Sequence, residues 1–232
     1  MSTEPIVGEI APVLLPPLLQ TFVFRSGWGE GADRGALRAA KKANMGTEGI
    51  VPKGYLKKVG MEEEGAALNL MESEHSGFKT KDMINIKGSD AVILIMRWDS
   101  KNQKHQDGVG RGTQQCANYI YESDYSVNEP LLKVLSPHRE TLTAGLFGSR
   151  SSPELLVLFV FDNDVERFVG QEEYHRAVCN MLRRRYKNNV KDMETFCCEN
   201  VMVGGPTEET LPGIELGVER FFDKVFETLK DE

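Results

Sequence analysis

The stretch TFVFRSGWGEGADRGALRAAKKAN, residues 21–44, predicts a strand, a glycine-rich turn and a helix in direct succession. Thr21–Arg25 is rich in β-branched and aromatic residues, which favour a short strand. The turn holds Gly27, Gly29 and Gly31, and the helix is expected from about Ala32 to Asn44. A helix that begins directly after such a turn offers backbone N–H groups and the positive end of its dipole to an anion. The segment therefore indicates an α/β protein with a candidate phosphate-binding loop.

The rest of the chain repeats this alternation of short strands and helices. Two continuous apolar runs, Ala91–Met96 and Leu155–Phe161, are typical of parallel strands buried on both faces. The order predicts a single domain over residues 21–232, with a Rossmann-like parallel sheet and helices on both faces. Further strands are expected at Gly49–Val51, Leu68–Met71 and Cys197–Val203, helices at Lys79–Lys87, around Tyr174–Tyr186 and at Gly213–Leu229, and a surface loop at Lys57–Ala67.

Two segments fall outside this alternation. Residues 1–20 are apolar in part, but they lack a basic leading region and are interrupted by Pro12, Pro16 and Pro17. We therefore expect an N-terminal arm rather than a signal peptide or a membrane span. Residues 121–153 form a long stretch with few structural signals, which we interpret as an excursion or lid.

The composition narrows the classes of function. The 232 residues include 28 Lys and Arg and 35 Asp and Glu, a formal net charge of −7. A general nucleic-acid binder needs an excess of basic residues, so we exclude that class. The four cysteines form no CxxC pair and the four histidines lack metal-ligand spacing, so we expect no metal site. This cysteine usage favours a reducing, cytoplasmic location.

Three glycine-containing loops follow predicted strands, at the edge where open parallel sheets collect ligands. The first, Gly27-x-Gly29-x-x-Ala32, fits the dinucleotide fingerprint, but its acidic partner is Glu48, which lies before the second strand rather than after it. This mismatch disfavours a classical NAD site. The second loop, Gly110-Arg111-Gly112-Thr113, opens a predicted helix, and the third is Gly204-Gly205-Pro206-Thr207. Each loop is either a phosphate cradle or a tight turn without a ligand.

Polar residues beside these loops complete the candidate site. Asp33 lies in the first turn of its helix, where it either contacts a ligand or caps the helix. Lys79 and Thr80 open the short helix before the most apolar strand, and Asn85 is an unusual amide inside that helix. Asp90, directly before the strand, also suits ordinary turn chemistry.

The motifs and their order resemble the SLOG superfamily, and within it the group named "putative molybdenum carriers" or circularly permuted YpsA-like proteins. The resemblance spans roughly residues 22–226 apart from the excursion, and it implies a Rossmann-like fold, a pocket for a nucleotide or related phosphorylated ligand, and a homo-oligomer. It rests on Ser26-Gly-x-Gly-x-Gly-Ala-Asp33-Arg34, Pro52-Lys53-Gly54, Lys79-Thr80 with Asn85, Ser89-Asp90, part of a Gly-Gly-Thr motif at Gly110–Thr113, and Asn200-Val201 with Gly205-Pro206.

The sequence departs from the family pattern at several positions. Trp28 and Glu30 stand where smaller or amide residues are usual. Related phosphoribohydrolases carry an acidic residue three places after their Gly-Thr, where this chain has Cys116. An N-glycosidase needs a carboxylate to stabilise an oxocarbenium-like centre or to activate water. This activity would therefore depend on a carboxylate from another loop: Asp33, Asp90 or Glu72.

The leading hypothesis is a sensor or carrier that binds a nucleotide or related phosphorylated ligand, without membrane association. The alternatives are a nucleoside-monophosphate phosphoribohydrolase and a carrier of a molybdopterin-type cofactor, and whether the protein is an enzyme stays open. The candidate ligand-binding residues are Ser26, Gly27, Gly29, Gly31, Asp33, Arg34, Pro52, Lys53, Gly54, Lys79, Thr80, Asn85, Gly110, Arg111, Gly112, Thr113 and Gly205.

Overall fold

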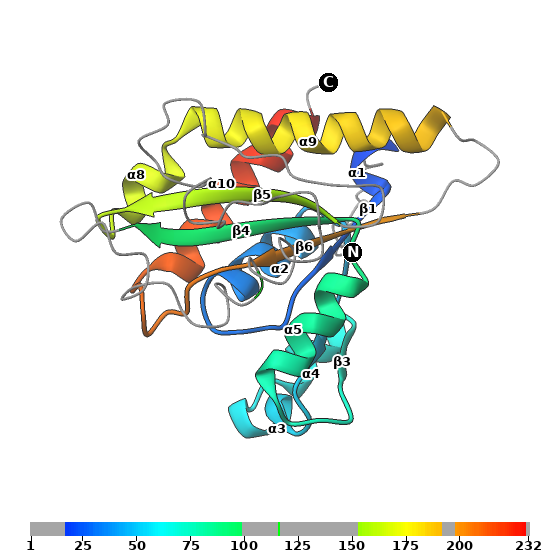
Figure 1. Cartoon of the computed structure of the whole chain (residues 1–232), viewed down its shortest axis with the longest axis vertical. Coiled ribbons are helices and arrows are strands. Elements are labelled where there is room, and N and C mark those ends of the chain that lie inside the picture. The colour runs from blue at the N-terminus through cyan, green and yellow to red at the C-terminus, as the bar shows by residue number, and fades with distance from the viewer. Residues whose placement is uncertain (1–16, 99–115, 117–152, 192–197, 231–232) are drawn as a thin grey trace, which may run out of the picture.

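The computed structural model describes residues 17–98, 116, 153–191 and 198–230 (Figure 1). Its centre is one parallel sheet with the strand order β3-β2-β1-β6-β4-β5. This arrangement confirms the predicted α/β, Rossmann-like class. The strands are β1 (Phe22–Arg25), β2 (Gly46–Val51), β3 (Leu70–Glu72), β4 (Ala91–Trp98), β5 (Glu154–Phe161) and β6 (Glu199–Gly204).

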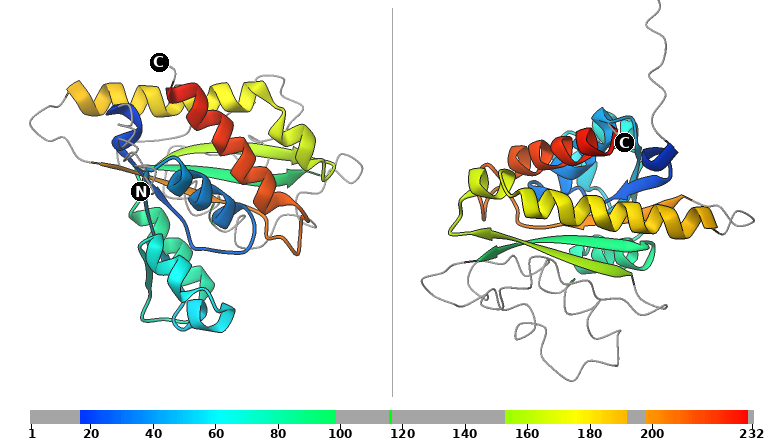
Figure 2. Two further views of the ribbon diagram at one scale, coloured as in Figure 1. Left: turned by 180° about the vertical axis from the view of Figure 1, so that it is seen from behind. Right: turned by 90° about the horizontal axis from the view of Figure 1, so that it is seen from above.

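Helices pack against both faces of the sheet. The main apolar cluster joins the sheet to α2, α8, α9 and α10, and Figure 2 shows α9 and α10 on the same side of the strands. On the opposite face, Ile86 of α5 and Cys116 pack against alternate residues of β4, β5 and β6. The helices are α1 (Pro17–Gln20), α2 (Ala32–Lys42), α3 (Tyr55–Val59), α4 (Glu62–Ala67), α5 (Phe78–Lys87), α8 (Val165–Val169), α9 (Glu172–Lys191) and α10 (Ile214–Lys230).

Aromatic contacts and small residues fasten α10 and α2 to the sheet and to each other. Phe24 of β1 meets Phe222 and Phe226 of α10 edge-to-face, with ring centroids 5.5 and 5.2 Å apart. Contacts of this kind add about 0.5–1.5 kcal/mol each beyond the area they bury. A Cβ atom on Gly35 of α2 would lie 2.2 Å from the carbonyl oxygen of Glu215, so this glycine permits the close approach of α10.

The predicted surface loop at 57–67 is wrong, because α3 and α4 occupy most of it. Leu56 is buried, packs against Gly65 and belongs to the main apolar cluster, which fixes these short helices to the rest of the domain. Glu62 and Glu63 lie in the first turn of α4, where acidic side chains favour the helix dipole. Both α3 and α4 are too short to show a clear apolar period in the sequence.

The order of the strands decides where a ligand site can form. From β1 the chain builds outward through β2 and β3, and it then returns to add β4 and β5 on the other side. The last strand, β6, pairs with β1 and β4 between these halves. The reversal places the loops after β1 and β6 side by side at the carboxyl edge, which is the usual ligand site of such sheets. None of the helices in the described ranges is long and apolar enough to cross a membrane.

Candidate functional site

The β1–α2 loop, residues 26–31, is tightly enclosed at the carboxyl edge of the sheet. Trp28 is fully buried and has a positive φ of 58°, an uncommon conformation for a bulky residue. Gly31 has a φ of 123°, and a Cβ there would lie 2.3 Å from the carbonyl oxygen of Pro206. A Cβ on Gly27 would lie only 1.9 Å from Nζ of Lys81. Glycine is therefore required at position 31 by the backbone of the following loop, while a side chain at position 27 would displace the amine of Lys81.

Lys81 of α5 lies at the centre of a buried charged cluster beside this loop. Its Nζ atom lies 2.8 Å from Oδ1 of Asp82 and 3.6 Å from Oδ2 of Asp33, and its side chain is 5% exposed. Burial alone would lower the pKa of Lys81, but the charges of Asp33 and Asp82 outweigh it and raise the pKa. The amine therefore stays protonated at neutral pH.

Two further side chains of the cluster titrate above their ordinary range. Burial raises the pKa of Asp82, and Lys81 opposes this shift only in part. Burial, together with the charges of Asp82 and Asp33, raises the pKa of the Cys116 thiol from 9.0 to about 12. Cys116 is thus a protonated, weakly reactive thiol at neutral pH, and the cluster offers carboxyl groups rather than a thiolate for chemistry.

The same loop holds two buried polar atoms without a hydrogen-bond partner among the described residues. They are Oγ of Ser26, which follows β1 directly, and Nε1 of Trp28. Leaving a buried polar group unpaired costs about 1–3 kcal/mol. Buried unpaired atoms that persist in a fold mark positions where a ligand or ordered water completes the bonding.

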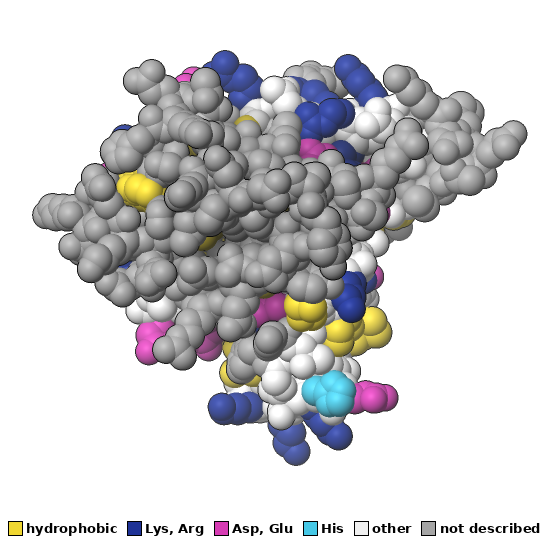
Figure 3. Space-filling model, in the orientation of Figure 1, with side chains coloured by type: hydrophobic (Ala, Val, Ile, Leu, Met, Phe, Trp, Pro, Cys, Tyr) yellow, Lys and Arg dark blue, Asp and Glu magenta, His cyan; other side chains and the backbone are white. Residues whose placement is uncertain are grey.

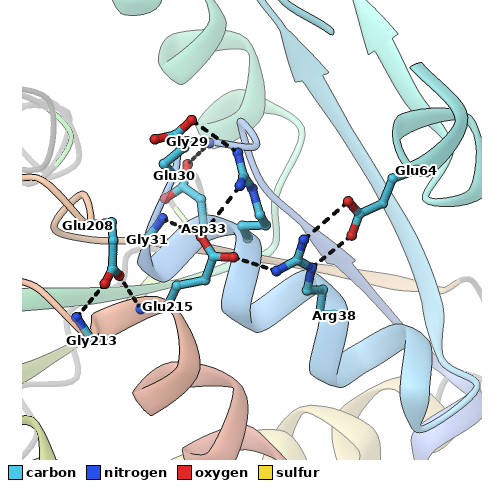
Figure 4. Close-up of polar contacts among 10 residues, drawn as sticks. Gly29, Glu30, Gly31, Asp33, Arg38, Glu64, Glu208, Gly213 and Glu215 are labelled. Carbon is cyan, nitrogen blue, oxygen red and sulfur yellow. Dashed lines mark hydrogen bonds and ion pairs between the residues drawn. The ribbon is translucent and has the colours of Figure 1, made fainter. Parts of the chain in front are cut away.

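The N–H groups on the α10 side of the loop are already bonded within the protein (Figure 4). The Gly31 N–H donates to Oε2 of Glu215 over 3.2 Å, and the Ala32 N–H donates to the Pro206 carbonyl over 3.1 Å. Gly31 also forms an antiparallel bridge with Thr207, which joins the loop after β1 to the loop after β6. The end of α2 that the sequence offers to an anion is therefore occupied, on this side, by protein atoms.

A comparison of the sequence with known protein families identifies the family of this chain. The sequence model described as "Circularly permutated YpsA SLOG family" matches residues 24–143, just over half of the chain and including the β1–α2 loop. The chain belongs to this family. The match confirms the family resemblance inferred from the sequence.

The fold of this SLOG protein is also similar to a solved structure. The crystal structure of a "Putative molybdenum carrier protein" from Syntrophus aciditrophicus SB superposes with a TM-score of 0.54 at 17% sequence identity. The match covers 89% of this chain and 95% of the other. At this identity the likeness shows the shared fold. No curated protein matches the chain.

The residues of the first glycine motif lie together in the SLOG protein. Asp33 does not cap α2; its Oδ2 accepts a hydrogen bond from the Gly29 N–H over 3.3 Å and also faces Lys81. Arg34 is buried, lies 3.7 Å from both Glu30 and Glu215, and stacks over the Trp28 ring with its guanidinium carbon 5.1 Å from the ring centroid. Arg34 therefore supports the loop from the α10 side.

The side chain of Asn85 bonds to the backbone of β2. Its amide donates to the Ile50 carbonyl over 3.0 Å and accepts from the Ile50 N–H over 2.9 Å. Both polar ends of this fully buried side chain hold α5 to β2. Asn85 was a candidate ligand-binding residue, and these two bonds instead favour a role in holding α5 against β2.

The residues after β2 lie beside the cluster but more outward. Lys53 is exposed, and its backbone N–H bonds to the His75 carbonyl, while Gly54 begins α3 with a φ of 72°. Figure 3 shows Lys and Arg side chains at this lower end of the molecule. Pro52 is buried and Thr80 is half-buried. Gly205 packs on Ala32, and the Lys79 side chain and Gly110, Arg111, Gly112 and Thr113 lie outside what the structure describes.

The carboxylates considered for hydrolysis do not all reach this edge. Asp90 precedes β4 at the opposite edge, where its Oδ2 accepts from the Asn200 N–H over 2.8 Å. Glu72 is exposed on β3. Asp33 is the member of this set that lies in the charged cluster. Asp90 is therefore a wrong candidate for that role, because strand direction separates it from the site, whereas Glu72 stays an untested candidate at the end of β3.

Lys81 and Asp82 are the members of the cluster that the sequence prediction missed. The motif Lys79-Thr80 with Asn85 drew attention to Lys79, two positions earlier. A usable signal was present, because Lys81 lies four residues before Asn85 and therefore on the same face of the helix. If Asn85 is expected to point into the protein, the same spacing predicts that the Lys81 side chain points inward as well.

Proposed function

We propose that the protein binds a nucleotide or related phosphorylated ligand at the carboxyl edge of its sheet, as a sensor or carrier. The observation that carries this proposal is the buried ammonium of Lys81 against Gly27. Asp33 and Asp82 compensate the burial of this charged amine. The place of the amine beside the glycine loop, at the strand-order reversal, supports a role toward an anion. A phosphate also suits the backbone of a glycine-rich loop.

The neighbouring hydroxyl strengthens the assignment to a phosphate. Oγ of Ser26 is fully buried and has no hydrogen-bond partner among the described residues. A hydroxyl donates well to a phosphate oxygen, and a protonated lysine binds phosphate as a point charge. We propose that Ser26 and Lys81 hold the phosphate, with Gly27 and Gly29 supplying close backbone approach and Asp33 orienting Lys81.

The test is thermal unfolding against nucleotides, nucleoside monophosphates, nucleotide sugars, NAD and molybdopterin analogues. A ligand at about 100 times its Kd stabilises the fold by roughly 2.7 kcal/mol. The Lys81→Met variant should lose the shift. Lys42→Met is the matched control, because Lys42 is exposed and pairs with Asp223 on the outer side of α2. Binding that survives Lys81→Met would contradict the proposed site, and a panel without any shift would contradict the function.

A second candidate is a phosphoribohydrolase, favoured by the two carboxyl groups beside Lys81. In such a reaction water adds to the ribose carbon, the N-glycosidic bond breaks, and the base leaves with a proton. The raised pKa of Asp82 suits a proton donor, and Asp33 would stabilise the cationic ribosyl centre. Incubation with nucleoside monophosphates should then release ribose 5-phosphate, and Asp82→Asn should abolish it. No product from any substrate would refute this activity.

A third candidate is a carrier of a molybdopterin-type cofactor, since the structural neighbour is described as a putative molybdenum carrier. Ser26 and Lys81 suit the phosphate of such a cofactor. Within the ranges described, no three His, Cys, Asp or Glu side chains are grouped to hold a metal ion, so these residues would bind the organic part. Pterin fluorescence that copurifies with the wild type but not with Lys81→Met would favour this candidate. Self-association and a cytoplasmic location stay predictions.

A further inference from the structure

Glu215 of α10 carries its carboxylate to the place where an anion would bind the N-terminus of α2. We infer that Glu215 determines specificity: it keeps pyrophosphate-containing ligands, such as nucleoside diphosphates and dinucleotides, out of a site that accepts one phosphate. This inference rests on the proposed phosphate-binding function. It concerns which phosphorylated ligands are accepted and which are refused.

The hydrogen bonds at the start of α2 show that this place is filled. Oε2 of Glu215 accepts from the Gly31 N–H (Figure 4). The Pro206 carbonyl accepts from the Ala32 N–H. In dinucleotide-binding folds a pyrophosphate occupies the N-terminus of the helix that follows the first strand. Here the fingerprint Gly27-x-Gly29-x-x-Ala32 is present, but a carboxylate from a residue 184 positions away stands in for the anion.

The position of the Glu215 carboxylate is held by several partners. Oε1 lies 2.5 Å from Nη1 of Arg38, and Oε2 lies 3.7 Å from Nη1 of Arg34. The Glu215 backbone N–H donates to Glu208, whose carboxylate also accepts from the Gly213 N–H. The side chain is 17% exposed. Because both oxygens and the backbone are engaged, an incoming anion would have to displace a bonded carboxylate.

The charges at this end of α2 add to the exclusion. Glu30 lies in the same loop, and Asp33 follows in the first turn of α2. A second phosphate group placed near Gly31 would meet the carboxylates of Glu30 and Glu215, and the nearby guanidinium groups of Arg34 and Arg38 are already engaged with these carboxylates. Like charges a few ångströms apart repel strongly in a half-buried site. Lys81 belongs to α5, which packs Ile86 on the face of the sheet opposite to α10. One phosphate beside Lys81 would meet Asp33 and Asp82, which pair with the amine, but not Glu215, which bonds to Gly31 from α10.

The experiment is calorimetric titration of the full chain with two matched pairs of probes: inorganic phosphate with pyrophosphate, and AMP with ADP. The wild type should bind the member with one phosphate at least about tenfold more tightly. Glu215→Gln should reduce this preference by about tenfold. Glu64→Gln is the matched control, because Glu64 pairs with the same Arg38 but bonds to no loop amide, and it should leave the preference unchanged.

The wild-type measurement keeps the inference falsifiable if Glu215→Gln does not fold. Equal affinity of the wild type for both members of each pair would overturn the specificity role while the proposed function stands. A preference that Glu215→Gln retains in full would overturn it as well. No binding of any of the four probes would instead overturn the phosphate site, and with it this inference.

Discussion

The Nζ atom of Lys81 lies 3.6 Å from Oδ2 of Asp33, which joins α5 to the first turn of α2 across the carboxyl edge of the sheet. The same Asp33 oxygen accepts from the Gly29 N–H. One carboxylate thus sets both the position of the buried amine and the shape of the glycine loop.

We first predict that Asp33→Asn destabilises the fold and weakens ligand binding. The substitution leaves the buried Lys81 with a single carboxylate, Asp82, and removes a charge-assisted bond to the loop. The expected loss is about 1–3 kcal/mol in the free energy of unfolding, measured in urea. Asp223→Asn breaks the exposed pair with Lys42 and should change stability by less than about 0.5 kcal/mol. Equal effects of the two variants would contradict a special role for Asp33.

Gly27→Ala should impair the site more than the fold. The added Cβ would lie 1.9 Å from Nζ of Lys81, so the amine must move away from the loop. We expect the affinity for the phosphorylated ligand to fall about tenfold or more, an effect of about 1.4 kcal/mol measured by calorimetry. Gly77→Ala is the control, since the nearest atom there is Oγ1 of Thr80 at 3.7 Å. Unchanged affinity in Gly27→Ala would argue against Lys81 as the phosphate partner.

Asn85→Ala tests the structural role assigned to the buried amide. Its loss leaves the N–H and C=O groups of Ile50 without their side-chain partner. We expect a loss of about 2–4 kcal/mol in the free energy of unfolding, since two buried bonds disappear. Asn180→Ala on the exposed face of α9 removes one surface bond to Arg183 and should change stability by about 0.5 kcal/mol or less. A small effect of Asn85→Ala on the free energy of unfolding would instead favour direct contact between Asn85 and the ligand.

The Cys116 thiol predicts a dependence of stability on alkaline pH. Its pKa is about 12 in the folded protein against an ordinary 9.0, so the unfolded chain loses this proton first. The stability that depends on the protonated thiol should therefore be fully present below about pH 9, and it should be lost as the pH rises from 9 toward 12. At pH 10 the stability lost through this thiol should be on the order of 1 kcal/mol. Comparing urea unfolding of the wild type and Cys116→Ala at pH 8 and pH 10 isolates it, and a constant difference between them would refute the shift.

Local patterns were sufficient for most elements of the fold. The apolar runs of β4 and β5, and the strand, glycine turn and helix of residues 21–44, were predicted because each depends on neighbours within a few positions. The helices α3 and α4 were not predicted because each spans fewer than two turns and therefore shows no apolar period. The glycine loop was predicted because its motif is also local. Its partners Lys81 and Glu215 were not predicted, because they lie far away in the sequence.

The sequence by itself determined the α/β class, the family and the loop that begins the site, since periodicity and short motifs encode these features locally. Only the tertiary structure decided that Lys81 faces Gly27, that Asp90 lies at the far edge, and that Glu215 fills the start of α2. These relationships depend on strand order and on helices packed across the sheet. They join residues up to 184 positions apart, and such contacts have no period or spacing that a single sequence displays.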